Sequence, residues 1–235
     1  MELSVNILSW NNKDTIYDCV RAVKNELSPT KINYEIIHVD NGSDDGSGDI
    51  ATIKNEKNLG ISAGKNQGID ASKGEYIMLL DGDIIPVPNS IICLLEYMRE
   101  HNEVEALGFF PQKWTIKRNK PGEIHHEEYC HNLYEVQELK VTCIYYGMFK
   151  RSIFKDKGLR FDESGVMGKC GYGWEDHDFY EQMRREGIKQ YAAHINNANG
   201  QYFHNMNSSI RAMGQKSYHM SQAERKQFFK EKWFD

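Results

Sequence analysis

The first 110 residues carry two alternating patterns of apolar positions. One pattern is a short, densely apolar run of strand length, and the other spaces apolar residues about 3.6 positions apart, as an amphipathic helix does. The runs lie at residues 3–10, 34–40, 75–81 and 104–110, and the helical spacings lie at 12–27, 59–74 and 88–101. Strands that alternate with helices predict an α/β fold with a mostly parallel sheet and helices on both faces.

Polar residues mark where two of these helices begin. Asn12 or Asp14 can cap the first helix, and Asn89 stands at the start of the third, just after Pro86 and Pro88. Asparagine and aspartate are preferred caps because their side chains accept hydrogen bonds from the first free backbone N–H groups of a helix.

The second half of the chain has a less regular pattern. Residues 134–154 predict a strand, a glycine turn and a short helix, and 171–187 predict a loop and a helix that stops at Gly187. Residues 189–204 predict a final edge strand and a turn. The tail from residue 208 is polar and basic, and its closing aromatic residues, Phe228, Phe229 and Trp233, predict a packed helix.

Composition narrows the class of protein. A chain of 235 residues with 40% hydrophobic and 27% charged residues suits one globular domain. The net charge of -5 gives no general attraction to nucleic acid or to an anionic membrane. No apolar run is long enough to span a membrane, and the N-terminus lacks the features of a signal peptide. The cysteines are scattered and odd in number, so we expect free thiols in a reducing cytoplasm. They are Cys19, Cys93, Cys130, Cys143 and Cys170.

Carboxylates stand at the ends of two predicted strands. Asp40 and Asp81 close their strands, and Asp83 follows after the single residue Gly82. Ligands of open α/β sheets bind beyond the carboxyl ends of the strands, so these side chains should share one crevice. Because buried carboxylates need a compensating charge, the Asp-Gly-Asp turn suits Mg²⁺ or Mn²⁺ next to a phosphate group. The alternative is a solvated turn.

The order of motifs around these carboxylates decides between the two interpretations. The chain reads "VDNGSDDGS" and then "NLGISAGKNQGIDASKGEYIMLLDGD". In order and spacing over the first hundred residues, this resembles the family 2 glycosyltransferases of the GT-A fold. The resemblance implies a nucleotide-sugar site with a divalent metal.

The resemblance also implies roles for individual residues. Asp40 would hold the nucleobase, and Ser9 and Trp10 would lie beside it, where the family often has Thr-Tyr. Asp81 and Gly82 would lie near the ribose and the metal. Lys65 and its neighbour Asn66 belong to the donor motif, with Lys65 near the diphosphate or Asp81. Asp83 would be a metal ligand, with Asp81 assisting.

A second group of residues, "CGYGWEDHDFYEQM", is similar to the Glu-Asp element of inverting GT-A enzymes. That similarity implies that Asp176 is the general base, that Glu175 orients the acceptor or replaces the base, and that Trp174 forms an apolar wall beside the sugar. A carboxylate is needed because an acceptor hydroxyl loses its proton only as it attacks. The alternative is that Glu175, Asp176 and Asp178 only cap a helix.

Histidines offer two further metal-binding hypotheses. GT-A enzymes often complete the metal site with a late histidine, which favours His204, with His194 as the alternative. In "EIHHEEYCH", His126 and Cys130 are four residues apart and would share one face of a helix, yet the pattern matches no metal motif. We interpret that segment as a loop that flanks the acceptor cleft.

Together these features predict a metal-dependent, inverting glycosyltransferase that uses a UDP-sugar and Mn²⁺ or Mg²⁺. We expect one domain over 1–235, with a donor half at 1–110, a catalytic and acceptor half at 111–207, and a helical tail at 208–235. The acceptor would be a glycan or another polymer, and a modified DNA base stays open although no basic groove is evident. The rival functions are a sugar nucleotidyltransferase and a non-catalytic sugar-binding module.

Overall fold

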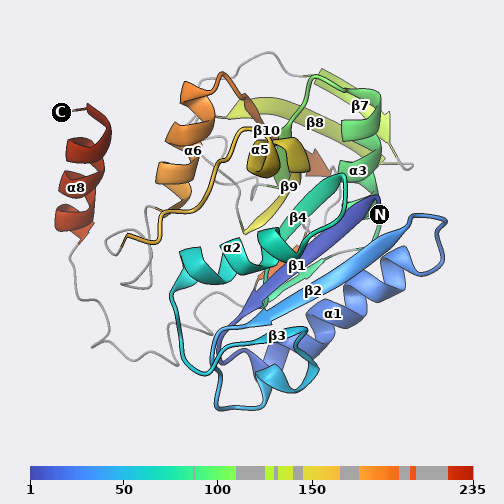
Figure 1. Ribbon diagram of the computed structural model, residues 1–235. Coiled ribbons are helices and arrows are strands. Elements are labelled where there is room, and N and C mark those ends of the chain that lie inside the picture. Colours follow the sequence, from blue (N-terminus) through green and yellow to red (C-terminus); the bar gives the residue numbers. More distant parts are fainter. Residues whose placement is uncertain are drawn as a thin grey trace.

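The computed structural model of the chain describes residues 1–86, 88–109, 125–129, 132–139, 145–164, 175–195, 202–204 and 222–234. Within these residues a sheet of nine strands has the order β3-β2-β1-β4-β9-β6-β10-β8-β7 (Figure 1). The pairings set β8 and β9 antiparallel to the other strands, so the sheet is mostly parallel, as predicted. Its strands are β1 (Leu3–Ser9), β2 (Tyr34–Asp40), β3 (Ile53–Lys54), β4 (Tyr76–Asp81), β6 (Ala106–Phe109), β7 (His125–Tyr129), β8 (Asn132–Leu139), β9 (Tyr146–Lys150) and β10 (Gln190–Ile195).

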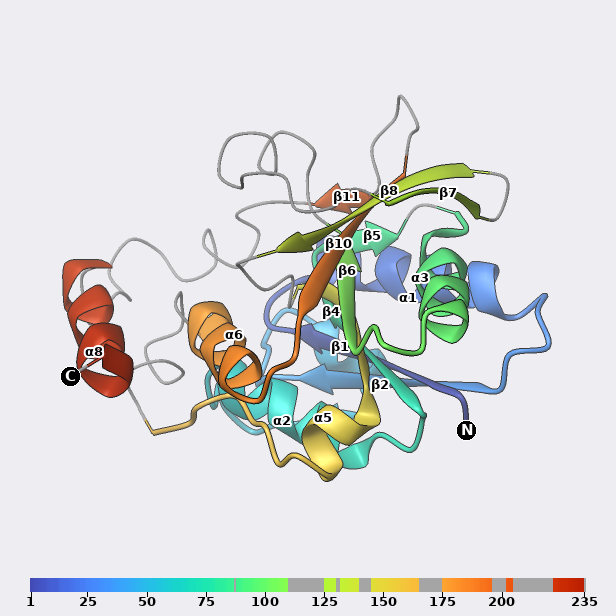
Figure 2. The same ribbon diagram turned by 90° about the horizontal axis from the view of Figure 1, so that it is seen from above.

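Helices cover both faces of this sheet. Figure 2 shows α1 and α3 on one face and α2, α5 and α6 on the other, with α8 lying outside α6. A smaller antiparallel pair is formed by β5 (Ile84–Pro86) and β11 (Tyr202–His204). The helices are α1 (Lys13–Leu27), α2 (Ile61–Ala71), α3 (Ser90–Glu100), α5 (Arg151–Lys155), α6 (Glu175–Arg185) and α8 (Gln222–Phe234), with a 3₁₀ turn η1 (Ser47–Ile50).

The alternation of strand side chains builds two cores. On β4, Met78 and Leu80 belong to the cluster under α1 and α3. Ile77 and Leu79 belong to the opposite cluster, with side chains of α2, α5 and α6. Because successive side chains of a strand point to opposite faces, one continuous apolar run can be buried on both sides.

Several sequence-based expectations for local structure were wrong. Asn12 precedes α1 without a side-chain capping bond. Asn89 precedes α3 with a left-handed φ of 68° and no capping side-chain bond. Glu26 of α1 caps α3 instead, because its Oε1 accepts from the N–H groups of Ile91 and Ile92 at 2.7 and 2.9 Å. Gly147 lies inside strand β9, which pairs on both sides, and not in a turn.

The expectation of an edge strand at β10 was also wrong. It pairs with β6 on one side and β8 on the other, so it is an inner strand of the sheet. Its apolar residues Ala192 and Ala193 are buried. Sequence alone could not show that a later strand would be flanked by an earlier hairpin, because that pairing is non-local.

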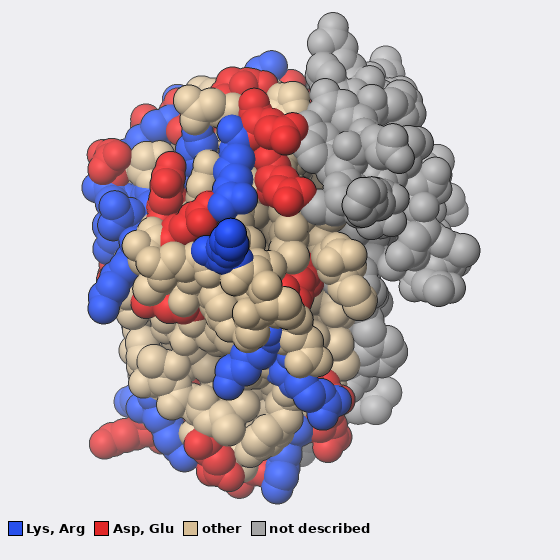
Figure 3. Space-filling view, turned by 90° about the vertical axis from the view of Figure 1, so that its right-hand side faces the viewer, with Lys and Arg blue, Asp and Glu red and all other residues tan. Residues whose placement is uncertain are grey.

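Cysteines, helix polarity and surface charge can be described for part of the chain. Cys19 and Cys93 are buried, free thiols, and the other three cysteines lie outside the described residues. None of the described helices is both long and apolar enough to cross a bilayer. The face in Figure 3 intersperses acidic and basic side chains, so the described part of that face offers no continuous basic track to a polyanion.

Gly74 generates a prediction about stability. A Cβ at this position would lie 2.5 Å from the backbone nitrogen of Ser4 and 2.7 Å from the carbonyl oxygen of Tyr76. Neither backbone atom can move without breaking the β1–β4 ladder, so Gly74→Ala should cost about 3 kcal/mol or more. Gly187→Ala is the matched control, because Gly187 has φ +71° and open space around it. Left-handed strain alone should cost about 1–2 kcal/mol. Urea unfolding of both variants checks this, and equal losses would contradict the packing argument.

Candidate active site

Three strands end side by side at one edge of the sheet. Ser9 is in register with Asp40 across β1 and β2, and Leu8 is in register with Asp81 across β1 and β4. Gly82 then turns the chain back, and its N–H donates to the Leu8 carbonyl at 2.8 Å. A Cβ on Gly82 would come within 2.9 Å of the Ser9 Cβ, so this close turn needs glycine. The structure therefore brings together the strand-end residues that the sequence singled out.

The Asp40 carboxylate lies under the loop that follows β2. Its Oδ1 accepts from the Ser43 hydroxyl at 2.5 Å, and its Oδ2 accepts from the Ser43 N–H at 3.1 Å. Asp40 is fully buried, and the Ser9 hydroxyl is 3.5 Å from its Oδ1. Trp10 is partly exposed next to this cluster, and its backbone N–H donates to Asn12 Oδ1 at 2.9 Å.

His38 is a member of this cluster that the sequence analysis missed. Its Nε2 lies 2.7 Å from the Ser9 hydroxyl, and it precedes Asp40 by two residues on the same face of β2. Burial lowers the pKa of His38, so the ring is neutral at pH 7. The sequence could have indicated this residue, because His38 lies two positions before Asp40 in a mostly apolar strand and therefore points to the same face of the sheet.

Helix α2 carries a lysine to the end of β4. Gly64 and Gly68 face β1, and a Cβ on Gly64 would lie 2.5 Å from Leu8 Cδ1. This close approach lets Lys65 Nζ donate to Asp81 Oδ1 at 2.8 Å. The lysine side chain is only 3% exposed, whereas Asp81 is 28% exposed. The carboxylate is thus the exposed member of the pair, and the buried ammonium compensates its charge from behind.

Asn66, the next residue of α2, has a different set of partners. Its amide nitrogen donates to the Phe161 carbonyl at 2.9 Å and to Glu163 Oε1 at 2.6 Å. Its Oδ1 accepts from the Phe161 N–H at 3.1 Å. The side chain therefore fastens α2 to residues 160–164, which lead towards α6.

Asp83 lies in the turn between β4 and β5 and is 6% exposed. The residue after it, Ile84, is in register with His204 of β11. His194 instead lies on β10 opposite Glu135 of β8. The backbone thus brings His204, and not His194, next to the Asp-Gly-Asp turn. Only the backbone of either histidine is described.

Glu175 and Asp176 open α6 with different environments. Glu175 is 7% exposed, and burial followed by the neighbouring Asp176 charge raises its pKa to about 7. Lys65 lowers this pKa and Asp81 raises it, so the Glu175 carboxyl lies within the field of that pair. Asp176 is a third exposed, and its Oδ1 accepts from the His177 N–H at 2.8 Å. Trp174 lies outside the described residues.

Potential metal ligands fall into two groups. Among the described side chains, no three His, Cys, Asp or Glu residues form a ready-made metal site. Asp81 and Asp83 nevertheless supply the hard oxygen donors that Mg²⁺ and Mn²⁺ prefer, and His204 adjoins them through the β5–β11 ladder. The donor set therefore fits a divalent ion. His126 belongs to strand β7, opposite Glu135, and not to a helix or a loop, while Cys130 lies outside the described residues.

Comparison with known proteins identifies the family of this chain. Residues 4–158 match the family Glycosyl transferase family 2. A poly(ribitol-phosphate) beta-glucosyltransferase of Bacillus spizizenii is 25% identical over 83% of this chain and 34% of its own length. The UDP-Glc:alpha-D-GlcNAc-diphosphoundecaprenol beta-1,3-glucosyltransferase WfaP of Escherichia coli is 33% identical over 51% of this chain and 49% of its own length. The chain thus spans about a third to a half of these relatives.

Solved structures share the fold at low sequence identity. S. aureus TarS 1-349, in complex with UDP-GlcNAc, superposes with a TM-score of 0.61 at 14% identity, over 98% of this chain and 71% of that chain. GalNAc-T7 with UDP, GalNAc and Mn²⁺ superposes with a TM-score of 0.58 at 15% identity, over 82% of this chain and 42% of that chain. The fold is therefore GT-A. Since the family match covers well over half of the chain, this protein belongs to glycosyl transferase family 2, a family of sugar-transferring enzymes.

Proposed function

We propose that this protein is a metal-dependent, inverting glycosyltransferase that moves a sugar from a UDP-sugar to a hydroxyl group of a glycan or another polymer. One observation carries the proposal: the strand ends at Ser9, Asp40 and Asp81 lie in register, and Lys65 of α2 pairs with Asp81 there. Ligands of such sheets bind at this edge. The donor class is supported by UDP-Glc in the name of the E. coli relative and by UDP-GlcNAc bound to TarS.

The donor would lie along β1, β2 and β4. In this proposal the base packs between Ser9 and Trp10, and Asp40 accepts from its imide N–H. Asp40 Oδ1 also accepts from the Ser43 hydroxyl at 2.5 Å, and a carboxylate has acceptor sites for both donors. Lys65 attracts the diphosphate and at the same time fixes the Asp81 carboxylate. Gly82 lets the chain approach the ligand closely.

Asp81, Asp83 and His204 would hold a divalent ion. When bound, such an ion neutralises the charge that develops on the departing diphosphate. Asp83 is 6% exposed and follows Asp81 by two residues at the end of β4, so both carboxylates would offer hard oxygen donors to one ion.

The transfer step assigns different tasks to the two carboxyl groups of α6. The acceptor oxygen attacks the anomeric carbon while the bond from that carbon to the diphosphate breaks, and the hydroxyl proton passes to Asp176. Asp176 suits this task because it is partly exposed and an acceptor arrives from solvent. Glu175, with a pKa of about 7, carries a proton in much of the population and can donate a hydrogen bond that orients the acceptor. Trp174 would supply an apolar wall beside the sugar.

Nucleotide binding should depend on a divalent ion through Asp83. Titration calorimetry of UDP with the wild type should give strong binding in Mn²⁺ and weak binding in EDTA, whereas Asp83→Ala should bind weakly in both. Asp156→Ala removes an exposed carboxylate and is the control. His204→Ala should weaken Mn²⁺-dependent binding, and His194→Ala should not. Equally tight binding of UDP in EDTA would contradict the metal role.

Asp176→Asn should keep donor affinity and lose turnover. Asparagine preserves the size of the side chain but accepts no proton at neutral pH, so the rate should fall by about a hundred- to ten-thousand-fold. Glu175→Gln should cost less, because glutamine can still donate a hydrogen bond. The measurement is UDP released from UDP-glucose and UDP-GlcNAc with Mn²⁺, beside UDP affinity. The reverse ranking would make Glu175 the base, and a binding module would release no UDP at all.

The pKa of Glu175 should respond to its neighbours in opposite directions. Lys65→Met removes a positive charge that favours the carboxylate, so the pKa should rise above about 7. Asp81→Asn removes a negative charge, so the pKa should fall. Carbon-13 NMR of protein labelled at the glutamate carboxyl carbons measures both, with Glu175→Gln assigning the signal and the exposed Lys24→Met as control. Shifts in the same direction would contradict the proposed proximity.

A further inference from the structure

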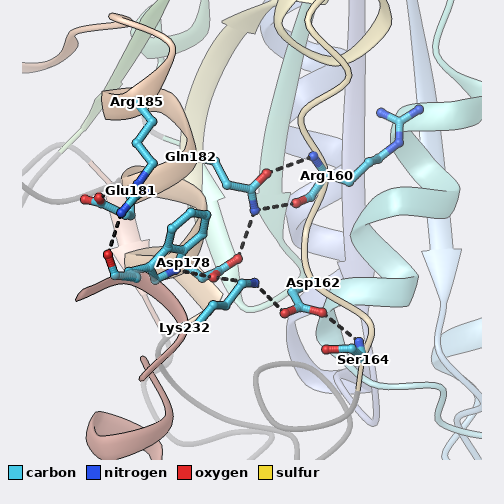
Figure 4. A network of polar contacts seen from close by, with 9 residues as sticks. Arg160, Asp162, Ser164, Asp178, Glu181, Gln182, Arg185 and Lys232 are labelled. Carbon is cyan, nitrogen blue, oxygen red and sulfur yellow. Dashed lines mark hydrogen bonds and ion pairs between the residues drawn. The ribbon is translucent and has the colours of Figure 1, made fainter. Parts of the chain in front are cut away.

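Asp178 is a fully buried carboxylate in the first turn of α6, and two residues of α8 bind it. Its Oδ1 accepts from the Trp233 ring N–H at 2.8 Å and lies 2.7 Å from Lys232 Nζ. Its Oδ2 accepts from the Gln182 amide at 2.9 Å. Figure 4 shows Asp178, Gln182 and Lys232 converging between α6 and α8. Both oxygens of Asp178 are therefore occupied by protein groups.

Lys232 joins a second carboxylate to the first. Its Nζ also donates to Asp162 Oδ2 at 2.5 Å, and Asp162 Oδ1 accepts from the Ser164 N–H at 2.7 Å (Figure 4). Burial lowers the pKa of Lys232, but the hydrogen bonds to Asp162 and Asp178 outweigh it and raise the pKa overall. The ammonium is thus held charged between the two carboxylates.

The segment that contains Asp162 is in turn fixed to the donor side. Asn66 of α2 binds the backbone of Phe161 and the side chain of Glu163. Gln182 of α6 binds the carbonyl of Arg160 at 2.8 Å. Residues 160–164 therefore connect α2, which carries Lys65, to α6, which carries the two proposed catalytic carboxyl groups.

Helix α8 also contacts the last turn of α6. The guanidinium of Arg185 lies 4.6 Å from the centre of the Trp233 ring and donates to the Trp233 carbonyl at 2.5 Å. Arg185 is in turn bound to Glu181 at 2.9 Å. With contacts at both the first and the last turn of α6, α8 fixes the direction of that helix as well as its distance from residues 160–164.

We propose that Lys232 and Trp233 are positioning residues for the transfer step, which hold the first turn of α6 so that Glu175 and Asp176 face the donor. This inference rests on the proposed function. Asp178 follows Glu175 and Asp176 within a single helical turn, so the three carboxylates move together. Removing Lys232 leaves the buried Asp178 charge uncompensated, which strongly favours displacement of that turn. A misplacement of about 1 Å at a reacting group costs about a hundred-fold in rate.

The test compares three substitutions on α8. Lys232→Met should lower kcat for release of UDP from UDP-glucose or UDP-GlcNAc by about a hundred-fold. The KM for the donor should stay unchanged, because the strand-end residues are untouched. Lys232→Arg should restore kcat to within about three-fold, because arginine can bridge the same two carboxylates. Lys230→Met, an exposed lysine on the same helix, is the control and should behave as the wild type.

Trp233→Phe and hydrogen exchange separate positioning from general stability. Trp233→Phe keeps a ring under Arg185 but removes the hydrogen bond to Asp178, so it should lower kcat less than Lys232→Met does. Exchange of the α6 amides should be faster in Lys232→Met, while that of β1 and β4 stays unchanged. Unchanged kcat in Lys232→Met, or losses of kcat and donor affinity that arginine does not rescue, would overturn the inference. If the wild type releases no UDP, the proposed function is wrong, and so is the proposed effect on kcat. Hydrogen exchange of the α6 amides in Lys232→Met would then still show whether α8 holds that helix.

Discussion

The ion pair between Lys65 and Asp81 is the interaction on which the rest of the site depends. Two charged groups at 2.8 Å, with the lysine almost wholly buried, are tolerated only because each satisfies the other. Their meeting requires α2 to lie close against β1, and Gly64 and Gly68 allow that approach. The same two groups also act on the pKa of Glu175 on α6, after the larger effects of burial and Asp176. The packing of α2 against β1 therefore places Lys65 and Asp81 near the carboxyl group that opens α6.

Much of the fold of the first 110 residues could be predicted from sequence, because it is built from local patterns. The apolar runs that end in Asp40 and Asp81 sit on neighbouring strands in register with β1. Side-chain alternation along β4 buries one run on two faces. The stop at Gly187 also follows from local chemistry, since a residue with φ +71° ends α6. These features need only a few consecutive residues to be specified.

The parts that sequence could not predict depend on contacts between distant segments. Glu26 replaces Asn89 as the cap of α3 from 65 residues away. Gly147 becomes part of an inner strand because β9 pairs with β4 on one side and with β6 on the other. Asp178 reads as a helix-capping charge in isolation, and only the fold reveals that Lys232 and Trp233 neutralise and fix it. In each case a hydrogen bond, an ion pair or a strand pairing between residues far apart in the sequence replaces the structure that the local sequence favours.

The central claim is that a nucleotide-sugar and a divalent ion share the edge formed by the ends of β1, β2 and β4. The most direct measurement is a crystal structure of the protein with UDP and Mn²⁺. We expect the ion bound by Asp83 and His204, the diphosphate beside the Lys65–Asp81 pair, and the base beside Ser9 and Trp10 with its imide N–H on Asp40. A UDP molecule bound away from this edge, or an ion held without Asp83, would contradict it.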